Sequence, residues 1–440
     1  MTGSVREINR LMIPLAAVGA ASVVNTMADR LFLSWHSDAA LQAVVPAVSL
    51  AGSLTCFFTT TVGYVSAFVG RAAGRGDLRG VRSALAQALV LAGCFLPFFA
   101  VLHPAGAAFI RASGHAPETV NAEVAALAWL LPSNAVRMFA AAFAGYFTGT
   151  GRTRVVGVAG VAGAVVNIAL DPLLIFGAGY VPAMGVAGSA AATLSASCTT
   201  TAFLAFAAYR DFRSNPVPGA MRPAGAEMWN LLRLGAPHGA MSLFCGSAFA
   251  VFVMAAGRLG PVALAASNVA FGFNGIYFTA VCAIREVCTA VVAHFKGRND
   301  ADAMRGTVRA SLLLSWIYAL AFSVSALLAA WFVADFFIGG DSSIEQPEFS
   351  KVLFALFVVM CTRSFAEGFS ETYAAALRGV GETAYILGVR IVCVLFVWMP
   401  LLALVLGSSG SIACCWTTMT AYLLASGLLL RKRWQKCVSA

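Results

Sequence analysis

Long apolar stretches separated by short polar segments recur along the whole chain of 440 residues. Each stretch reaches about 20 residues, the length that a helix needs to cross the hydrocarbon core of a bilayer. The pattern predicts an all-α polytopic membrane protein with twelve transmembrane helices. The expected helices cover residues 8–35, 40–70, 80–103, 122–147, 154–178, 184–210, 227–256, 262–295, 305–338, 350–376, 383–407 and 411–430.

Composition narrows the class of protein further. Hydrophobic residues make up 60% of the chain and charged residues only 11%, against about 25% charged residues in soluble domains. A soluble enzyme is therefore excluded. The formal charge of +10 would suit binding of nucleic acid, but the Lys and Arg residues are concentrated in particular loops. If both termini lie on the same side of the membrane, 21 of the 29 Lys and Arg residues lie on that side.

This asymmetry predicts the orientation of the chain, because cytoplasmic loops are enriched in Lys and Arg. Both termini are expected in the cytoplasm, and the protein is expected in the plasma membrane, which is the inner membrane in a bacterium. The lipid bilayer is the expected environment, and no nucleic-acid partner is predicted.

The sequence also repeats itself. An offset of 223 positions places Pro14 on Pro237 and Asp77 on Asp300, and an offset of 230 places Gly149 on Gly379. Such matches predict two parallel six-helix repeats, with the substrate site between them. The expected parts are an N-lobe (1–210), a cytoplasmic linker (211–226), a C-lobe (227–430) and a basic cytoplasmic tail (431–440).

Polar residues inside the apolar stretches are the first candidates for a functional site, because a charge in hydrocarbon is costly. Asn167 and Asp171 are four residues apart and share one helix face. Pro172 follows Asp171 and disfavours helical geometry there. Asp29 and Thr193 would complete a pocket of oxygen ligands for a proton or Na+. Alternatively, Asp29 pairs with Arg30, and Asp171 is a satisfied buried group.

The second half has its own polar residues at membrane depth. Arg363, Glu367 and Glu371 recur at every fourth position along one helix face, which predicts a net negative stripe. The stripe either takes part in ion coupling or substrate binding, or it is a structural ion-pair network. Arg285 and Glu286 could join such a network.

With these residues identified, the chain resembles the multidrug and toxic compound extrusion (MATE) transporters nearly from end to end. The telling segments are NIALDPLLIFG with GVAGSAAAT, the loops VGRAAGRGD and AHFKGRND, and ALRGVGET. The resemblance implies two lobes in a V, alternating access, and export of cationic or amphipathic compounds while H+ or Na+ moves inward. H+ or Na+ would be the coupling ion, and no other cofactor is expected.

The resemblance also implies roles for individual residues. Pro14 is similar to the kink-forming proline of helix one. The N-lobe cation or proton site would comprise Asp29, Asn167, Asp171 and Thr193. Glu367 matches an acid used in the C-lobe of other branches.

Two departures bear on these roles. Cys245 stands where branches of the NorM kind have a glutamate in helix seven. Either Glu286 replaces that acid, or the C-lobe does not couple ions. Arg30 directly after Asp29 is also unexpected, and it puts the protonation of Asp29 in doubt.

A flippase, a major-facilitator transporter and an enzyme are the alternatives to drug export. A flippase for lipid-linked oligosaccharides would handle anionic carriers, for which Arg137, Arg285, Arg363 and Arg390 are candidate contacts. A major-facilitator transporter would also have two six-helix halves, but the loop GRAAGRGDLRG lacks the central Asp of its motif. An enzyme is not expected, because no H-E-x-x-H helix, P-loop or paired Cys motif occurs. The expected partners are organic cations or amphipathic drugs, and a monomer is expected.

Overall fold

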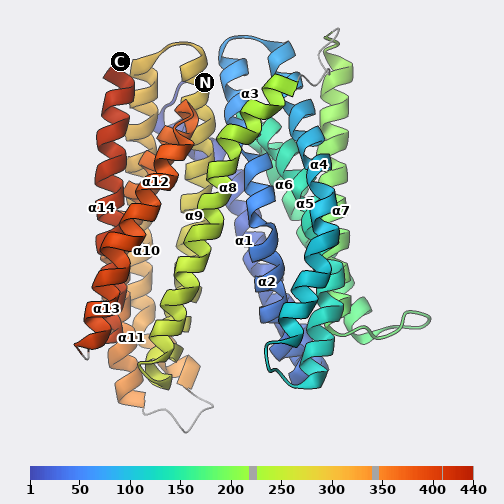
Figure 1. Cartoon of the computed structure of the whole chain (residues 1–440), viewed down its shortest axis with the longest axis vertical. Coiled ribbons are helices and arrows are strands. Elements are labelled where there is room, and N and C mark those ends of the chain that lie inside the picture. The colour runs from blue at the N-terminus through green and yellow to red at the C-terminus, as the bar shows by residue number, and fades with distance from the viewer. Residues whose placement is uncertain (218–224, 339–345, 409, 440) are drawn as a thin grey trace. The chain divides into compact units, whose positions relative to one another are not determined.

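The computed structural model describes residues 1–217, 225–338, 346–408 and 410–439, and this part of the chain is almost entirely helical. It contains twelve helical spans that are long and apolar enough to cross a membrane, which confirms the predicted fold class (Figure 1). The elements are α1 (Val5–His36), α2 (Asp38–Gly63), α3 (Val65–Gly74), α4 (Leu78–Arg111), α5 (Pro117–Gly149), α6 (Thr153–Phe176), α7 (Val186–Ser214), α8 (Gly225–Gly257), α9 (Pro261–Gly297), α10 (Ala301–Ile338), α11 (Gln346–Val380), α12 (Thr383–Cys393), the π-helical turn η1 (Val394–Trp398), α13 (Met399–Gly407) and α14 (Ile412–Ser439).

Several local features differ from the hydropathy pattern. The second span is divided at Tyr64 into α2 and α3, and the eleventh contains the π-helical turn η1. The expected loss of helical geometry at Asp171 is wrong, because α6 continues through Pro172 to Phe176. A proline removes one backbone hydrogen bond without necessarily ending a helix when neighbouring helices pack around it.

The ends of the two halves are more helical than their polar composition suggests. Helix α7 continues to Ser214 and α8 begins at Gly225, so both ends of the expected linker are helical, while residues 218–224 lie outside the described residues. Helix α14 runs to Ser439, so the basic residues from 431 onward extend the last span.

The loops that precede α4 and α10 show that the sequence repeat is also a structural repeat. Asp77 accepts a hydrogen bond from the Gly80 amide at 2.8 Å, and Asp300 accepts one from the Ala303 amide at 2.9 Å. These aspartates satisfy amides that the first turn of a helix leaves free. The preceding residues, Gly76 and Asn299, both have positive φ, at 71° and 55°.

Close helix contacts repeat as well. A Cβ atom at Gly149 would lie 2.7 Å from the Cβ of Val69, and one at Gly379 would lie 2.9 Å from the Cβ of Val292. Only a glycine allows the two backbones to approach so closely. The offsets that align the sequence therefore align two six-helix repeats with the same internal packing.

The chain forms two compact units. Ile13–Leu243 form one, called the N-unit here, and Met1–Met12 with Phe244–Ala440 form the other, called the C-unit. The unit boundaries pass through α1 and α8. Both termini belong to the C-unit and lie at the same end of it (Figure 1).

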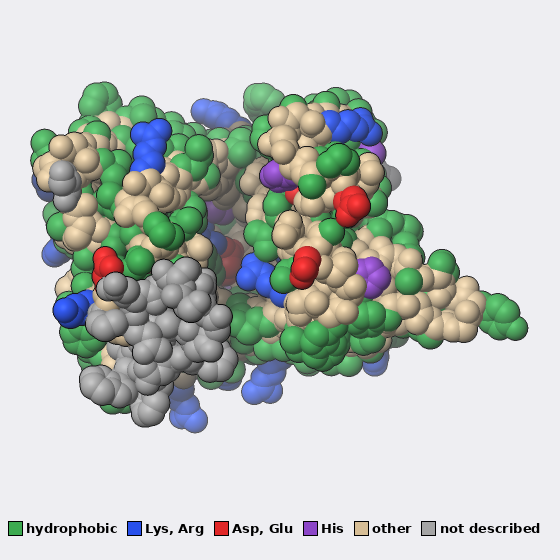
Figure 2. All heavy atoms as spheres, turned by 90° about the horizontal axis from the view of Figure 1, so that it is seen from below, with side chains coloured by type: hydrophobic (Ala, Val, Ile, Leu, Met, Phe, Trp, Pro, Cys, Tyr) green, Lys and Arg blue, Asp and Glu red, His purple; other side chains and the backbone are tan. Residues whose placement is uncertain are grey.

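The surface is apolar over large areas. Among the exposed large side chains, Phe109 is 67% exposed, Leu404 69% and Phe396 74%. Figure 2, seen from below, shows charged side chains as isolated spots on that end of the molecule. Such exposed apolar surface suits contact with lipid chains.

Candidate functional site

In the N-unit, α1 and α6 make direct contact through small residues. A Cβ atom at Gly157 would lie 2.7 Å from the Cβ of Pro14, and one at Gly160 would lie 2.6 Å from a γ-carbon of Val18. The two glycines, three residues apart on α6, therefore let α1 approach at the turn that contains Pro14. Pro14 itself lies inside the unbroken helix α1.

Farther along the same helices, two Asn-x-x-x-Asp pairs bring four polar side chains to membrane depth. Asn25 and Asp29 lie on α1, and Asn167 and Asp171 lie on α6. The spacing of four residues places both members of each pair on one helix face. Asp171 is fully buried and Asn167 is 2% exposed.

The Asp29 and Asp171 carboxyl groups lie close enough to interact with each other. Within the described residues, one carboxyl oxygen of Asp29 and both of Asp171 are buried without a well-formed hydrogen bond, as are Asn25 Oδ1 and Asn167 Nδ2. Neither aspartate forms an ion pair in that part of the chain. Buried polar groups normally have partners, so the described polar atoms of this cluster have unused capacity to bind a proton or a cation.

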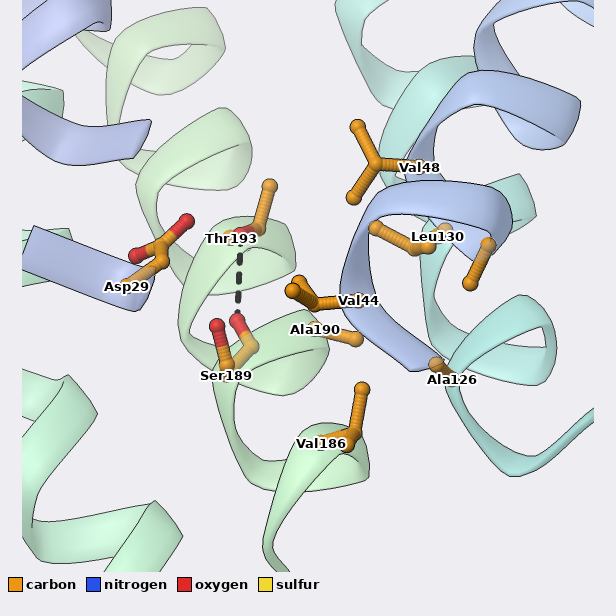
Figure 3. A pocket seen from close by; sticks show the side chains of 10 residues that line it. Asp29, Val44, Val48, Ala126, Leu130, Val186, Ser189, Ala190 and Thr193 are labelled. Carbon is orange, nitrogen blue, oxygen red and sulfur yellow. Dashed lines mark hydrogen bonds between the residues drawn. The ribbon is translucent and has the colours of Figure 1, made fainter. Parts of the chain in front are cut away.

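A small cavity opens beside Asp29. Its volume of about 10 Å³ corresponds to about one water molecule. Figure 3 shows Asp29 on one side with Ser189 and Thr193 of α7, and apolar side chains of α2 and α5 on the other. The Thr193 hydroxyl donates to the Ser189 carbonyl at 3.0 Å, so its oxygen can still accept a hydrogen bond or bind a cation.

Carboxylate, amide and hydroxyl oxygens are hard ligands, which bind a proton or a hard cation such as Na+. The structure thus brings together Asp29 with Asp171 and Asn167, as the sequence predicted, and it places Thr193 on the wall of the adjoining cavity. Sequence reasoning missed Asn25 and Ser189. Asn25 could have been found, because its spacing to Asp29 is the same as that of Asn167 to Asp171.

The acids of the C-unit are held differently. Arg363 on α11 lies 3.2 Å from the Glu367 carboxylate and donates to Asn274 Oδ1 at 2.6 Å. The Glu371 carboxylate receives Arg390 of α12 at 2.6 Å, and Arg285 and Arg378 at 3.6 Å each.

This arrangement corrects the prediction of a net negative stripe on α11. Arg285 of α9 and Arg390 of α12 converge on Glu371, which the periodicity of one helix cannot reveal, and the alternative of a structural ion-pair network is what the structure shows. Of the candidate C-lobe residues, Arg363, Glu367 and Glu371 lie inside the ion-pair network. Glu286 is at its edge, 3.5 Å from Arg285 with a side chain that is 39% exposed. Arg137, on α5 of the N-unit, is exposed.

The duplicated helical fold and the buried polar sites in each unit define a membrane transporter built from two repeats. The sequence matches the MatE family model over residues 14–173 and again over residues 237–404. These matches cover well over half of the chain. The protein therefore belongs to the MatE family, and the predicted resemblance is confirmed.

Individual relatives agree with this assignment. The chain is 28% identical over 387 residues to a probable multidrug resistance protein NorM of Bradyrhizobium diazoefficiens, covering 86% of this chain and 81% of the relative. It is 29% identical over 380 residues to the corresponding protein of Deinococcus radiodurans, covering 82% and 80%. A solved structure described as MATE in the straight conformation has the same fold, with a TM-score of 0.89, 19% identity, and coverage of 99% of this chain and 96% of the other.

Proposed function

We propose that the protein is a secondary active antiporter that exports cationic or amphipathic small molecules in exchange for inward H+ or Na+, by alternating access. The names of the NorM relatives support drug efflux over transport of a lipid-linked sugar. The observation that carries the ion-coupling proposal is the facing pair Asp29 and Asp171, whose carboxyl groups have three buried oxygens without a well-formed hydrogen bond and form no ion pair in the described N-unit.

The electrostatics of this pair suggest how coupling works. Two adjacent carboxylates without a counter-charge are unfavourable at membrane depth, because each buried charge costs several kcal/mol. A proton or Na+ between them relieves this cost, and so does the positive charge of a substrate. Ion and substrate therefore stabilise alternative states, and each shifts the equilibrium by its differential affinity for them.

Helix α1 provides a mechanical link in this proposal. Pro14 lacks the amide that would bond to the preceding turn, so α1 can bend there at lower cost than elsewhere. Because α1 also holds Asp29, ion binding at the aspartates would change the bend and collapse the N-unit pocket. Substrate would then leave on the outer side.

The test is efflux of organic cations from proteoliposomes under H+ and Na+ gradients imposed separately. The wild type should transport under one gradient, which identifies the ion. Asp171→Asn should reduce gradient-driven transport to the level of empty vesicles while remaining folded. Glu118→Gln is a matched control, because Glu118 is exposed in the first turn of α5. Full transport by Asp171→Asn would refute the proposal.

A further inference from the structure

Seven charged side chains of the C-unit lie close together, and their charges do not balance. They form one cluster on α9, α11 and α12, which we call the arginine cluster: Arg285, Glu286, Arg363, Glu367, Glu371, Arg378 and Arg390. Four guanidinium groups face three carboxylates, so the described cluster has one excess positive charge. Cys245, which lies beside Arg390, Glu371 and Tyr422, adds no negative charge.

Arg363 and Arg390, called the inner arginines here, have most of their hydrogen-bonding groups occupied. Arg390 donates to Glu371 at 2.6 Å, and also to Tyr422 at 3.2 Å and Ser426 at 3.1 Å. Arg363 is shared between Glu367 and Asn274. These contacts lie at or near normal hydrogen-bond length. The inner arginines therefore have little capacity left for a ligand.

Arg285 is held more loosely. Its guanidinium nitrogens lie 3.6 Å from Glu371 and 3.5 Å from Glu286, and its Nε has no hydrogen bond within the described residues. Both distances exceed those of normal hydrogen bonds. Glu286 is the next residue in sequence, and adjacent side chains on a helix point apart. The pairing with Glu286 is therefore easy to exchange.

Arg285 is also accessible, with 23% of its side chain exposed. Two helical turns earlier on the same face of α9, Phe278 is 41% exposed. A guanidinium with weakly held donors, on the same helix face as an exposed aromatic ring, can bind an oxyanion through two parallel hydrogen bonds while the apolar body of the ligand extends toward the ring.

We propose that Arg285 is the anion-binding residue of the C-unit and takes the carboxylate of an amphipathic aromatic ligand, in exchange for Glu286. The bound carboxylate neutralises the excess positive charge of the arginine cluster. The inference rests on the proposed transport function only in assuming that such ligands are transported. Binding itself needs no gradient.

The test is a fluorescence-polarisation titration of the purified full-length protein with an aromatic dye that carries a free carboxylate and, separately, with its methyl ester. Arg285→Gln should weaken binding of the acid by about tenfold or more, since a hydrogen bond to a charged group contributes about 1.5–3 kcal/mol. Binding of the ester should stay within about twofold. Equal weakening of both dyes, or no weakening of the acid, would overturn the proposal.

Two further variants keep the test decisive if Arg285→Gln does not fold. Glu286→Gln removes the competing carboxylate and should tighten binding of the acid but not of the ester, whereas unchanged or weaker acid binding would count against exchange. Arg258→Gln removes an exposed arginine between α8 and α9 and should bind both dyes as the wild type does. This titration can fail while gradient-driven efflux of organic cations succeeds, so the two proposals are separable.

Discussion

The two units share a backbone plan but distribute buried charge in opposite ways. In the N-unit, Asp29 and Asp171 face each other, and neither forms an ion pair within the described residues. In the C-unit, Glu367 and Glu371 are surrounded by arginines. Acids that are already paired have little to gain from binding another cation, whereas unpaired acids have much to gain.

The sequence repeat allows residues at matching positions of the two units to be compared. The offset of 223 places Asp29 on Phe252, and the offset of 230 places Asp171 on Leu401. In the reverse direction Glu367 falls on Arg137. The two repeats therefore share their turns and glycine contacts, whereas their buried charged residues differ. This difference supports ion coupling in the N-unit and anion recognition in the C-unit.

The largest expected effect separates the two units by transport. Asp29→Asn should abolish gradient-driven efflux, because it removes half of the carboxylate pair. Glu367→Gln should keep most of it, because Glu367 is already paired with Arg363. Efflux from proteoliposomes of both variants, at matched protein incorporation, measures the difference. Equal loss in the two variants would mean that both units couple ions.

A second effect concerns stability in the C-unit. Glu371→Gln should destabilise the fold by about 3–5 kcal/mol, because it leaves Arg285, Arg378 and Arg390 without their shared carboxylate. Glu286→Gln is the matched control at the exposed edge of the arginine cluster, and it should cost less than about 1 kcal/mol. Thermal unfolding in detergent compares the two. Similar melting temperatures for both variants would show that the network contributes little.

The smallest expected effect concerns an ion pair whose acidic and basic residues are exchanged between the two units. Arg152 pairs with Asp211 at 2.7 Å in the N-unit, whereas in the C-unit Glu382, which the offset of 230 places on Arg152, pairs with Arg433 at 3.0 Å. The hydrogen bonds that Arg152 donates to the Asp211 carboxylate raise the pKa of Arg152, so this arginine stays charged at any pH suited to the folded protein.

Arg152→Glu breaks the ion pair with Asp211 and should lower the free energy of unfolding by up to about 1 kcal/mol. The double variant Arg152→Glu with Asp211→Arg should recover much of the loss. Thermal unfolding of the single and double variants measures this coupling. No recovery would mean that the surrounding residues, such as Tyr146, have fixed the polarity.

Much of the fold could be predicted from the sequence, because spans and turns depend on local patterns. The lengths of the apolar stretches predict the twelve helices, and the matching Asp77 and Asp300 identify equivalent loops in the two repeats. The i, i+4 spacing of Asn167 and Asp171 was also a local signal, and the structure adds Asp29 from another helix. In contrast, the sequence left the ion-pair network as one of two alternatives for α11, because Arg285 and Arg390 reach Glu371 from other helices through tertiary packing.

The central claim is that the coupling ion binds between Asp29 and Asp171. The most direct measurement is release of that ion when an organic cation binds to the purified protein, followed with a pH indicator for H+ and an ion-selective electrode for Na+. The account predicts release from the wild type and from Glu367→Gln, but none from Asp171→Asn or Asp29→Asn, at substrate concentrations that saturate each protein. Undiminished release from both aspartate variants would contradict it.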